Sequence, residues 1–160
     1  MIAFDEQGTA RLDERLIRAA IRLSSDNLLR NVELMSETFD GDLMLGLIFS
    51  AILQANVRHI SSDPALGAKY GLMGSVPPDE LRQPISVNAL SESLGIPYET
   101  TRRYVNQLLK RGLCIKVGGK GVVIPGAVIS SPEAMAAGVK QFNHLMHFLR
   151  QLKEIGFEVD

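Results

Sequence analysis

The sequence predicts a mainly α-helical protein that carries one small β-hairpin. In three long stretches, apolar residues recur at steps of three and four, which is the spacing of amphipathic helices. Only near residues 113–124 do two short runs of strand-forming residues flank a glycine-rich turn. With 160 residues, of which 46% are hydrophobic and 22% charged, the chain has the composition of an ordinary globular protein. We therefore expect helices before and after a small hairpin, packed around one core.

The composition also favours a cytoplasmic protein. The single cysteine, Cys114, excludes a disulfide within the chain. Its apolar neighbours indicate a small buried side chain in a strand, with a redox-sensing thiol as the alternative. The first residues lack the basic and apolar regions of a secretory signal. The longest strongly apolar stretch, residues 43–53, is interrupted by Gly46 and Ser50 and is too short for a bilayer. We expect no membrane partner.

Helices are predicted for the first 60 residues. Residues 9–39 have an amphipathic pattern, which we expect Ser-Ser-Asp at 24–26 to divide by capping a new helix, with one continuous helix as the alternative. Asp-Gly-Asp at 40–42 is a firmer break. Residues 43–60 are apolar nearly all round, so they form the candidate central core helix.

Residues 61–84 are predicted to form a long loop, because glycines and prolines interrupt regular structure there. A short helical turn is expected at residues 78–81, because Pro78 suits the first position of a helix and two acidic residues follow it. A loop of this length inside a compact domain tends to be functional or mobile. Its role is not indicated by its residues.

The pattern that follows is typical of a helix-turn-helix. Ser86 is placed to cap a brief helix whose inner face carries Leu90 and Leu94. Gly95 supplies the backbone freedom for a tight turn, and a second helix begins near Pro97, whose fixed φ suits a first turn.

The second helix, residues 97–111, has an inward and an outward side. The inward stripe consists of Thr101, Val105, Leu108 and Leu109. The residues expected to point outward or to flank that stripe are Glu99, Thr100, Arg102, Arg103, Asn106 and Lys110. After Gly112, two β-rich runs, 113–117 and 122–124, surround glycines that permit the positive φ of a hairpin turn.

Residues 86–103, together with Leu108, Gly112 and Leu113, resemble the winged helix-turn-helix of bacterial transcription regulators, including the MarR and IclR families. The resemblance covers about a quarter of the chain and does not single out one family. It implies a sequence-specific regulator that binds double-stranded DNA. Helix 97–111 would then read the major groove, and the wing, residues 113–125, would contact the backbone. The winged helix-turn-helix as a whole spans residues 85–126.

Charge supports this interpretation. Residues 84–126 contain six cations and two anions, a net charge of +4 in a chain whose total is −1. Positive charge concentrated on the second helix and the hairpin suits a localised nucleic-acid surface. The opposite interpretation is a merely solvated helix face.

The residues expected to contact DNA have separate roles. Arg102 or Arg103 matches guanine and Asn106 matches adenine, because their donor and acceptor geometry fits those base edges. Tyr98 either stacks against a sugar or packs, and Glu99 either stabilises the helix N-terminus or accepts from cytosine. Phosphate contacts are expected from Thr100, Lys110, Lys116 and Lys120, and from amides of the helix that Ser86 caps.

The C-terminal region, residues 127–160, contains a helix at about 133–155 whose apolar residues span roughly 200° of its circumference, wider than the ~100° stripe of a surface helix. We expect a homodimer in which this helix and the N-terminal helices pack across a two-fold axis. The alternative is that residues 9–39 cover the whole arc within one chain.

No enzymatic function is expected. His144 and His147 lie three apart but have no third metal ligand in a recognisable spacing, and no phosphate-binding loop or nucleophile elbow is present. We expect neither a metal nor another cofactor. A small-molecule effector stays an open possibility that the sequence does not identify. The alternative to DNA binding is a winged-helix module that binds a protein partner.

Overall fold

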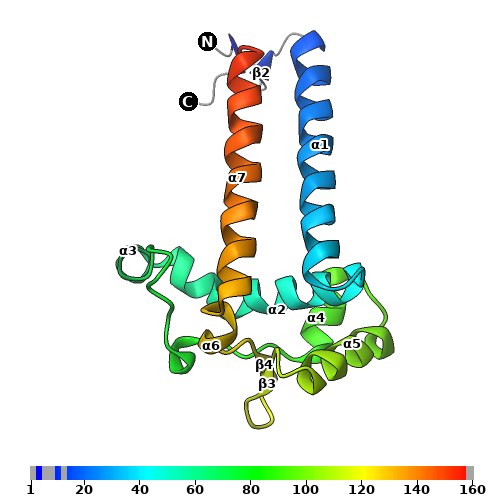
Figure 1. Ribbon diagram of the computed structural model, residues 1–160, viewed down its shortest axis with the longest axis vertical. Coiled ribbons are helices and arrows are strands. Elements are labelled where there is room, and N and C mark those ends of the chain that lie inside the picture. The colour runs from blue at the N-terminus through cyan, green and yellow to red at the C-terminus, as the bar shows by residue number, and fades with distance from the viewer. Residues whose placement is uncertain (1–2, 5–9, 12–13, 158–160) are drawn as a thin grey trace. The chain divides into compact units, whose positions relative to one another are not determined.

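The computed structural model describes residues 3–4, 10–11 and 14–157 (Figure 1). The chain divides into two compact units, each of which is described here by itself. The paired-helix unit consists of residues 1–34 and 137–160, and the core unit consists of residues 35–136. Both are mainly helical, and the core unit contains one antiparallel hairpin.

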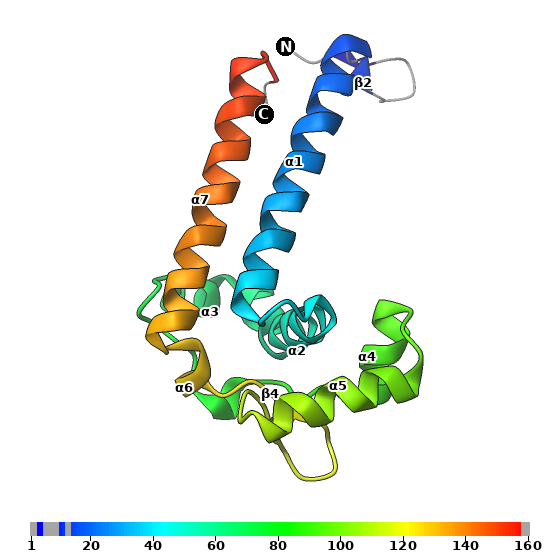
Figure 2. The ribbon, with the colours of Figure 1, turned by 45° about the vertical axis from the view of Figure 1, so that its right-hand side comes forward.

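The paired-helix unit contains most of two long helices, whose ends at residues 35–38 and 132–136 belong to the core unit. Helix α1 spans Glu14–Thr38 and helix α7 spans Pro132–Glu154. Within this unit they run antiparallel and side by side in both ribbon views (Figures 1 and 2). Ahead of α1, strand β1 (Ala3–Phe4) pairs antiparallel with strand β2 (Ala10–Arg11). The amphipathic helix was predicted from residue 9, so this strand pair is a difference from the prediction.

Helix α1 is continuous through residues 24–26, so the predicted division there is wrong. The Ser25 hydroxyl donates to the carbonyl of Ile21 in the preceding turn at 3.0 Å. Asp26 pairs with Arg30 in the following turn at 2.8 Å. Both side chains therefore find partners inside one helix, and neither caps a new one.

Helix α2, Leu43–Ser62, is the core helix that the apolar pattern predicts. The Asp42 carboxylate caps it by accepting from the amide of Leu45 at 3.0 Å. Ile48 and Ile52 are fully buried, and α2 packs against two later helices, Val87–Leu94 and Tyr98–Lys110, and against the hairpin. Among the described residues, α2 alone is long and apolar enough by composition to cross a membrane, a test that the core helix of a soluble protein also meets.

The segment predicted as a long loop, residues 61–84, contains helix α3 (Pro64–Lys69). Asp63 caps α3 by accepting from two of its first amides, and Pro64 occupies the first turn. An Asp-Pro pair at a helix start is a recognisable signal that the sequence reasoning missed. The predicted helical turn near residues 78–81 is present as the 3-10 helix η1 (Asp79–Leu81).

Two short helices follow, and the turn between them has the predicted chemistry. Helix α4 spans Val87–Leu94, and the Ser86 hydroxyl caps it by accepting from the amide of Ala89 at 3.1 Å. Gly95 ends α4 in the left-handed conformation, with φ of 64°. Helix α5 spans Tyr98–Lys110, so Pro97 lies one residue before its first turn and not in it.

The hairpin is shorter than predicted. Strand β3 (Ile115–Lys116) pairs with strand β4 (Val122–Val123), and Ile85 adds a single bridge to Val122. Cys114 lies just before β3, outside the strand expected for it, but it is buried as predicted. Burial raises the pKa of the Cys114 thiol to about 11. The short helix α6 (Gly126–Ile129) separates the hairpin from α7 and was not foreseen.

Candidate nucleic-acid interface

Helix α5 has one buried and one exposed side, because its apolar residues recur at helical spacing. Thr101 and Leu108 are completely buried and Val105 is 2% exposed, where α5 packs against α2 and α4. On the other side, long polar side chains border a shallow, open depression. Its lining consists of Glu99, Thr100, Arg102, Arg103, Asn106, Gln107 and Lys110. All the polar residues predicted to point outward are therefore together, and Gln107, one turn after Arg103, is an addition that helical spacing could have indicated.

The two arginines on this face have different partners. Arg102 donates from Nε to one carboxylate oxygen of Glu99 at 2.9 Å, and its Nη2 forms an ion pair with the same oxygen at 2.8 Å. The hydrogen bond and the negative charge of Glu99 raise the pKa of Arg102. The guanidinium of Arg103 instead lies over the ring of Tyr104, with its central carbon 5.1 Å from the ring centroid.

The hairpin presents its lysines to solvent. Val122, Val123 and Ile124 are buried against the core, whereas both residues of β3 are exposed. Lys116 and Lys120 are therefore exposed on the outer strand and in the turn. Within the described part of the chain, four cations of the candidate surface form no ion pair, namely Arg103, Lys110, Lys116 and Lys120.

In both ribbon views, α5 and the hairpin lie on the same side of α2 within the core unit (Figures 1 and 2). Tyr98 is 46% exposed in the first turn of α5, which keeps it accessible at the edge of this surface. Ser86 is exposed, but its hydroxyl is occupied as the cap of α4. The amides at that helix start, and not the hydroxyl, are thus what remains for a phosphate.

Asn56 holds the hairpin on the core helix, and the sequence reasoning missed it. Its side chain is completely buried on α2. The amide nitrogen donates to the carbonyls of Gln83 at 2.7 Å and Val122 at 3.2 Å. Its oxygen accepts from the amide of Ile124 at 2.8 Å. One polar side chain thus joins α2, the entry to α4 and strand β4.

A second anchor lies at the end of the hairpin. The side chain of Arg82 is fully buried and donates to the Asp79 carboxylate at 3.2 Å and to the carbonyl of Pro77 at 3.0 Å. The same Asp79 oxygen accepts from the amide of Gly126 at 2.6 Å. Gln83 and Asp79, which lie in the segment predicted as a loop, therefore hold the two ends of the segment from α4 to the hairpin.

Comparison of the chain with protein-family models, with curated proteins and with solved structures found no match. Among the described residues, no group of three or more histidine, cysteine, aspartate or glutamate side chains is placed to hold a metal ion. In the paired-helix unit, His144 faces Asn31, with Nδ1 3.4 Å from the amide oxygen. The interpretation of the surface therefore depends on its own residues.

Proposed function

We propose that the protein is a sequence-specific, double-stranded-DNA-binding transcription regulator, whose residues 85–126 act as a winged helix-turn-helix. The observation that carries the proposal is the two-sided helix α5. It buries an apolar face on α2 and α4 and leaves Arg102, Arg103, Asn106 and Lys110 on its outer side. The resemblance of residues 86–103 to bacterial regulators, MarR and IclR proteins among them, supports the same assignment.

The proposed roles follow from base and phosphate chemistry. An α-helix fits the major groove, where an arginine matches guanine and Asn106 matches adenine. Lys110, Lys116 and Lys120 are exposed cations without ion pairs in the described structure, so they suit phosphate contacts that set the register. The alternative, a module that binds a protein, would more often present an apolar or acidic outer face.

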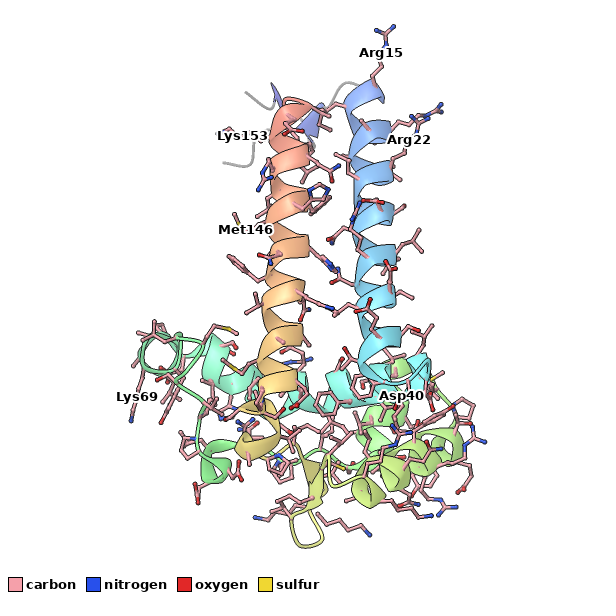
Figure 3. All side chains as sticks on the ribbon, viewed as in Figure 1. Arg15, Arg22, Asp40, Lys69, Met146 and Lys153 are labelled. Carbon is pink, nitrogen blue, oxygen red and sulfur yellow. The ribbon has the colours of Figure 1, made fainter. Side chains whose placement is uncertain are left out.

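The test is the affinity for random duplex DNA measured against salt concentration. Each phosphate contact contributes about −0.9 to the slope of log K against log salt. Replacing Lys116 and Lys120 together by alanine should make the slope shallower by about 2. The matched control is Lys69→Ala, because Lys69 lies on α3, away from α5 and the hairpin (Figure 3).

Binding that does not depend on salt, or is absent, would exclude the DNA assignment and favour the protein-binding alternative. Selection of bound sequences from a random duplex pool then measures specificity. A regulator should enrich a defined sequence, whereas a non-specific binder should not.

The proposed regulator acts as a homodimer through α1 and α7. In the paired-helix unit, several large apolar side chains are more exposed than two of the asparagines. Leu28 is 63% exposed, Leu29 is 66% exposed and Phe142 is 58% exposed, whereas Asn27 and Asn31 are half-buried. The amide oxygen of Asn27 is even buried without a hydrogen-bond partner. Two helices with this distribution do not bury their apolar area by themselves.

A second copy of the chain fits the uncovered faces. Met146 on α7 points away from α1 (Figure 3), so the exposed apolar face of α7 is not the side that meets α1. Helix α1 contains four basic and four acidic residues, and α7 contains three and two, so two copies do not repel each other. Two antiparallel pairs would form a four-helix arrangement related by a two-fold axis.

Sedimentation equilibrium at micromolar concentration tests the dimer. The wild type should sediment at twice the chain mass, and Phe142→Glu should give monomer because it places a charge in the apolar contact. Asn143→Glu is the control, since it adds the same charge to an exposed polar neighbour. A monomeric wild type would rule out this part of the proposal.

A further inference from the structure

Arg102 and Arg103, the two alternative guanine readers, are held in different ways. Arg102 donates from Nε to Glu99 and forms an ion pair with it through Nη2, on the outer side of α5. The guanidinium carbon of Arg103 lies 5.1 Å from the centroid of the Tyr104 ring, and Arg103 has no ion pair in the described structure. The Arg102–Glu99 pair and the Arg103–Tyr104 contact therefore differ in which guanidinium N–H donors they leave available for a base.

A guanidinium has five N–H donors in a rigid plane. In Arg102, Glu99 takes donors from the edge formed by Nε and Nη2. The edge formed by Nη1 and the second hydrogen of Nη2 stays unused by Glu99, and it carries the two parallel donors that O6 and N7 of guanine require. Since Glu99 already fixes the plane, Arg102 has less rotational freedom to lose on binding.

We infer that Arg102 is the residue that reads guanine and that Glu99 is its positioning residue. The inference rests on the proposed DNA-binding function. Glu99 has a second effect, because its carboxylate offsets the charge of Arg102 and repels phosphates. The pair therefore weakens binding to random sequence and improves discrimination of a guanine. Arg103, whose guanidinium contacts the Tyr104 ring and no carboxylate in the described structure, is left for phosphate contacts.

A purely structural role for Glu99 makes different predictions. An acidic residue in the first turn of a helix stabilises the helix dipole, and an exposed ion pair adds little to stability. Either effect would change the unfolding midpoint slightly in a Glu99 variant. Neither would change the preference for one base or the salt dependence of binding.

The experiment uses the duplex selected from a random pool and variants of it in which each G·C pair is replaced in turn. Affinity of the full-length protein is measured for these and for random duplex at several salt concentrations. The wild type should lose about 5- to 150-fold in affinity at one G·C position, the value of a single bidentate contact. Arg102→Lys and Glu99→Gln should both reduce that loss to a few-fold, and Arg103→Lys should retain it.

Glu99→Gln should also bind random duplex more tightly than the wild type, with a salt slope steeper by about 0.9. Circular dichroism should show all three variants folded, because the altered side chains are exposed. Retained discrimination in Glu99→Gln, or its loss in Arg103→Lys and not in Arg102→Lys, would overturn the inference while leaving DNA binding intact. A selected site without a discriminated guanine would do the same. A wild type without salt-dependent binding would overturn the proposed function and the inference with it.

Discussion

Replacing Asn56 should destabilise the core unit more than any change at an exposed position of the same helix. Asn56→Ala removes three hydrogen bonds and leaves the amide of Ile124, a completely buried residue, without a partner. An orphaned buried amide costs about 1–3 kcal/mol, and each of the other bonds contributes about 0.5–1.5 kcal/mol. Val122 still accepts from the amide of Ile85, and Gln83 is exposed enough for water to replace its bond. We therefore expect a loss of about 3 kcal/mol.

Urea unfolding monitored by tyrosine fluorescence measures this loss selectively. The chain has three tyrosines and no tryptophan, and all three tyrosines lie in the core unit. With a slope of about 1–3 kcal/mol per molar urea, the midpoint should fall by about 1–3 M. Gln54→Ala is the control, since Gln54 is an exposed amide side chain on the same helix.

Asn56→Leu separates hydrogen bonding from packing, because it removes the same bonds but fills the space. It should remain clearly less stable than the wild type. Wild-type stability in Asn56→Leu, or equal midpoints for Asn56→Ala and Gln54→Ala, would refute the argument that polar anchoring holds the hairpin on α2.

Three further changes test other parts of the core unit. Gly121→Ala should lower the free energy of unfolding in urea by at least about 2 kcal/mol, since φ is 137° and the added carbon would meet the backbone of Ile85. The control, Gly119→Ala, should be nearly neutral, because the space around Gly119 is open. Cys114 should react with iodoacetamide at pH 8 at least about tenfold more slowly in the folded protein than in urea, because burial raises its pKa to about 11; equal rates would contradict its burial. Ser86→Ala should lower stability by about 1 kcal/mol through the lost cap of α4, and an unchanged urea midpoint would show that the cap contributes nothing.

Local chemistry was sufficient to predict helices α4 and α5 and the turn between them. The Ser86 cap, the left-handed Gly95 and the inward stripe of α5 each depend on residues within one or two turns of each other. The outward grouping of Arg102, Arg103, Asn106 and Lys110 follows from the same helical period. For these features the nearest neighbours in the chain supply the whole physical cause.

Residues 24–26 show where a local signal is ambiguous. Serine and aspartate cap a helix in one context and, in another, bond to the preceding turn or pair with a residue four positions on. In α1, Ser25 bonds to the preceding turn and Asp26 pairs with Arg30, so the helix continues through them. Only the backbone actually adopted distinguishes the two outcomes.

The sequence by itself determined the mainly helical composition, the core helix α2, the hairpin and the polar outer face of α5. The tertiary structure decided which polar residues became buried anchors. Asn56 bonds to Gln83, which lies 27 residues further along the chain, and to Val122, which lies 66 residues further along. Asp79 joins Arg82 to Gly126. Such residues carry no periodic signal, because their burial is favourable only once distant backbone groups have arrived to pair with them.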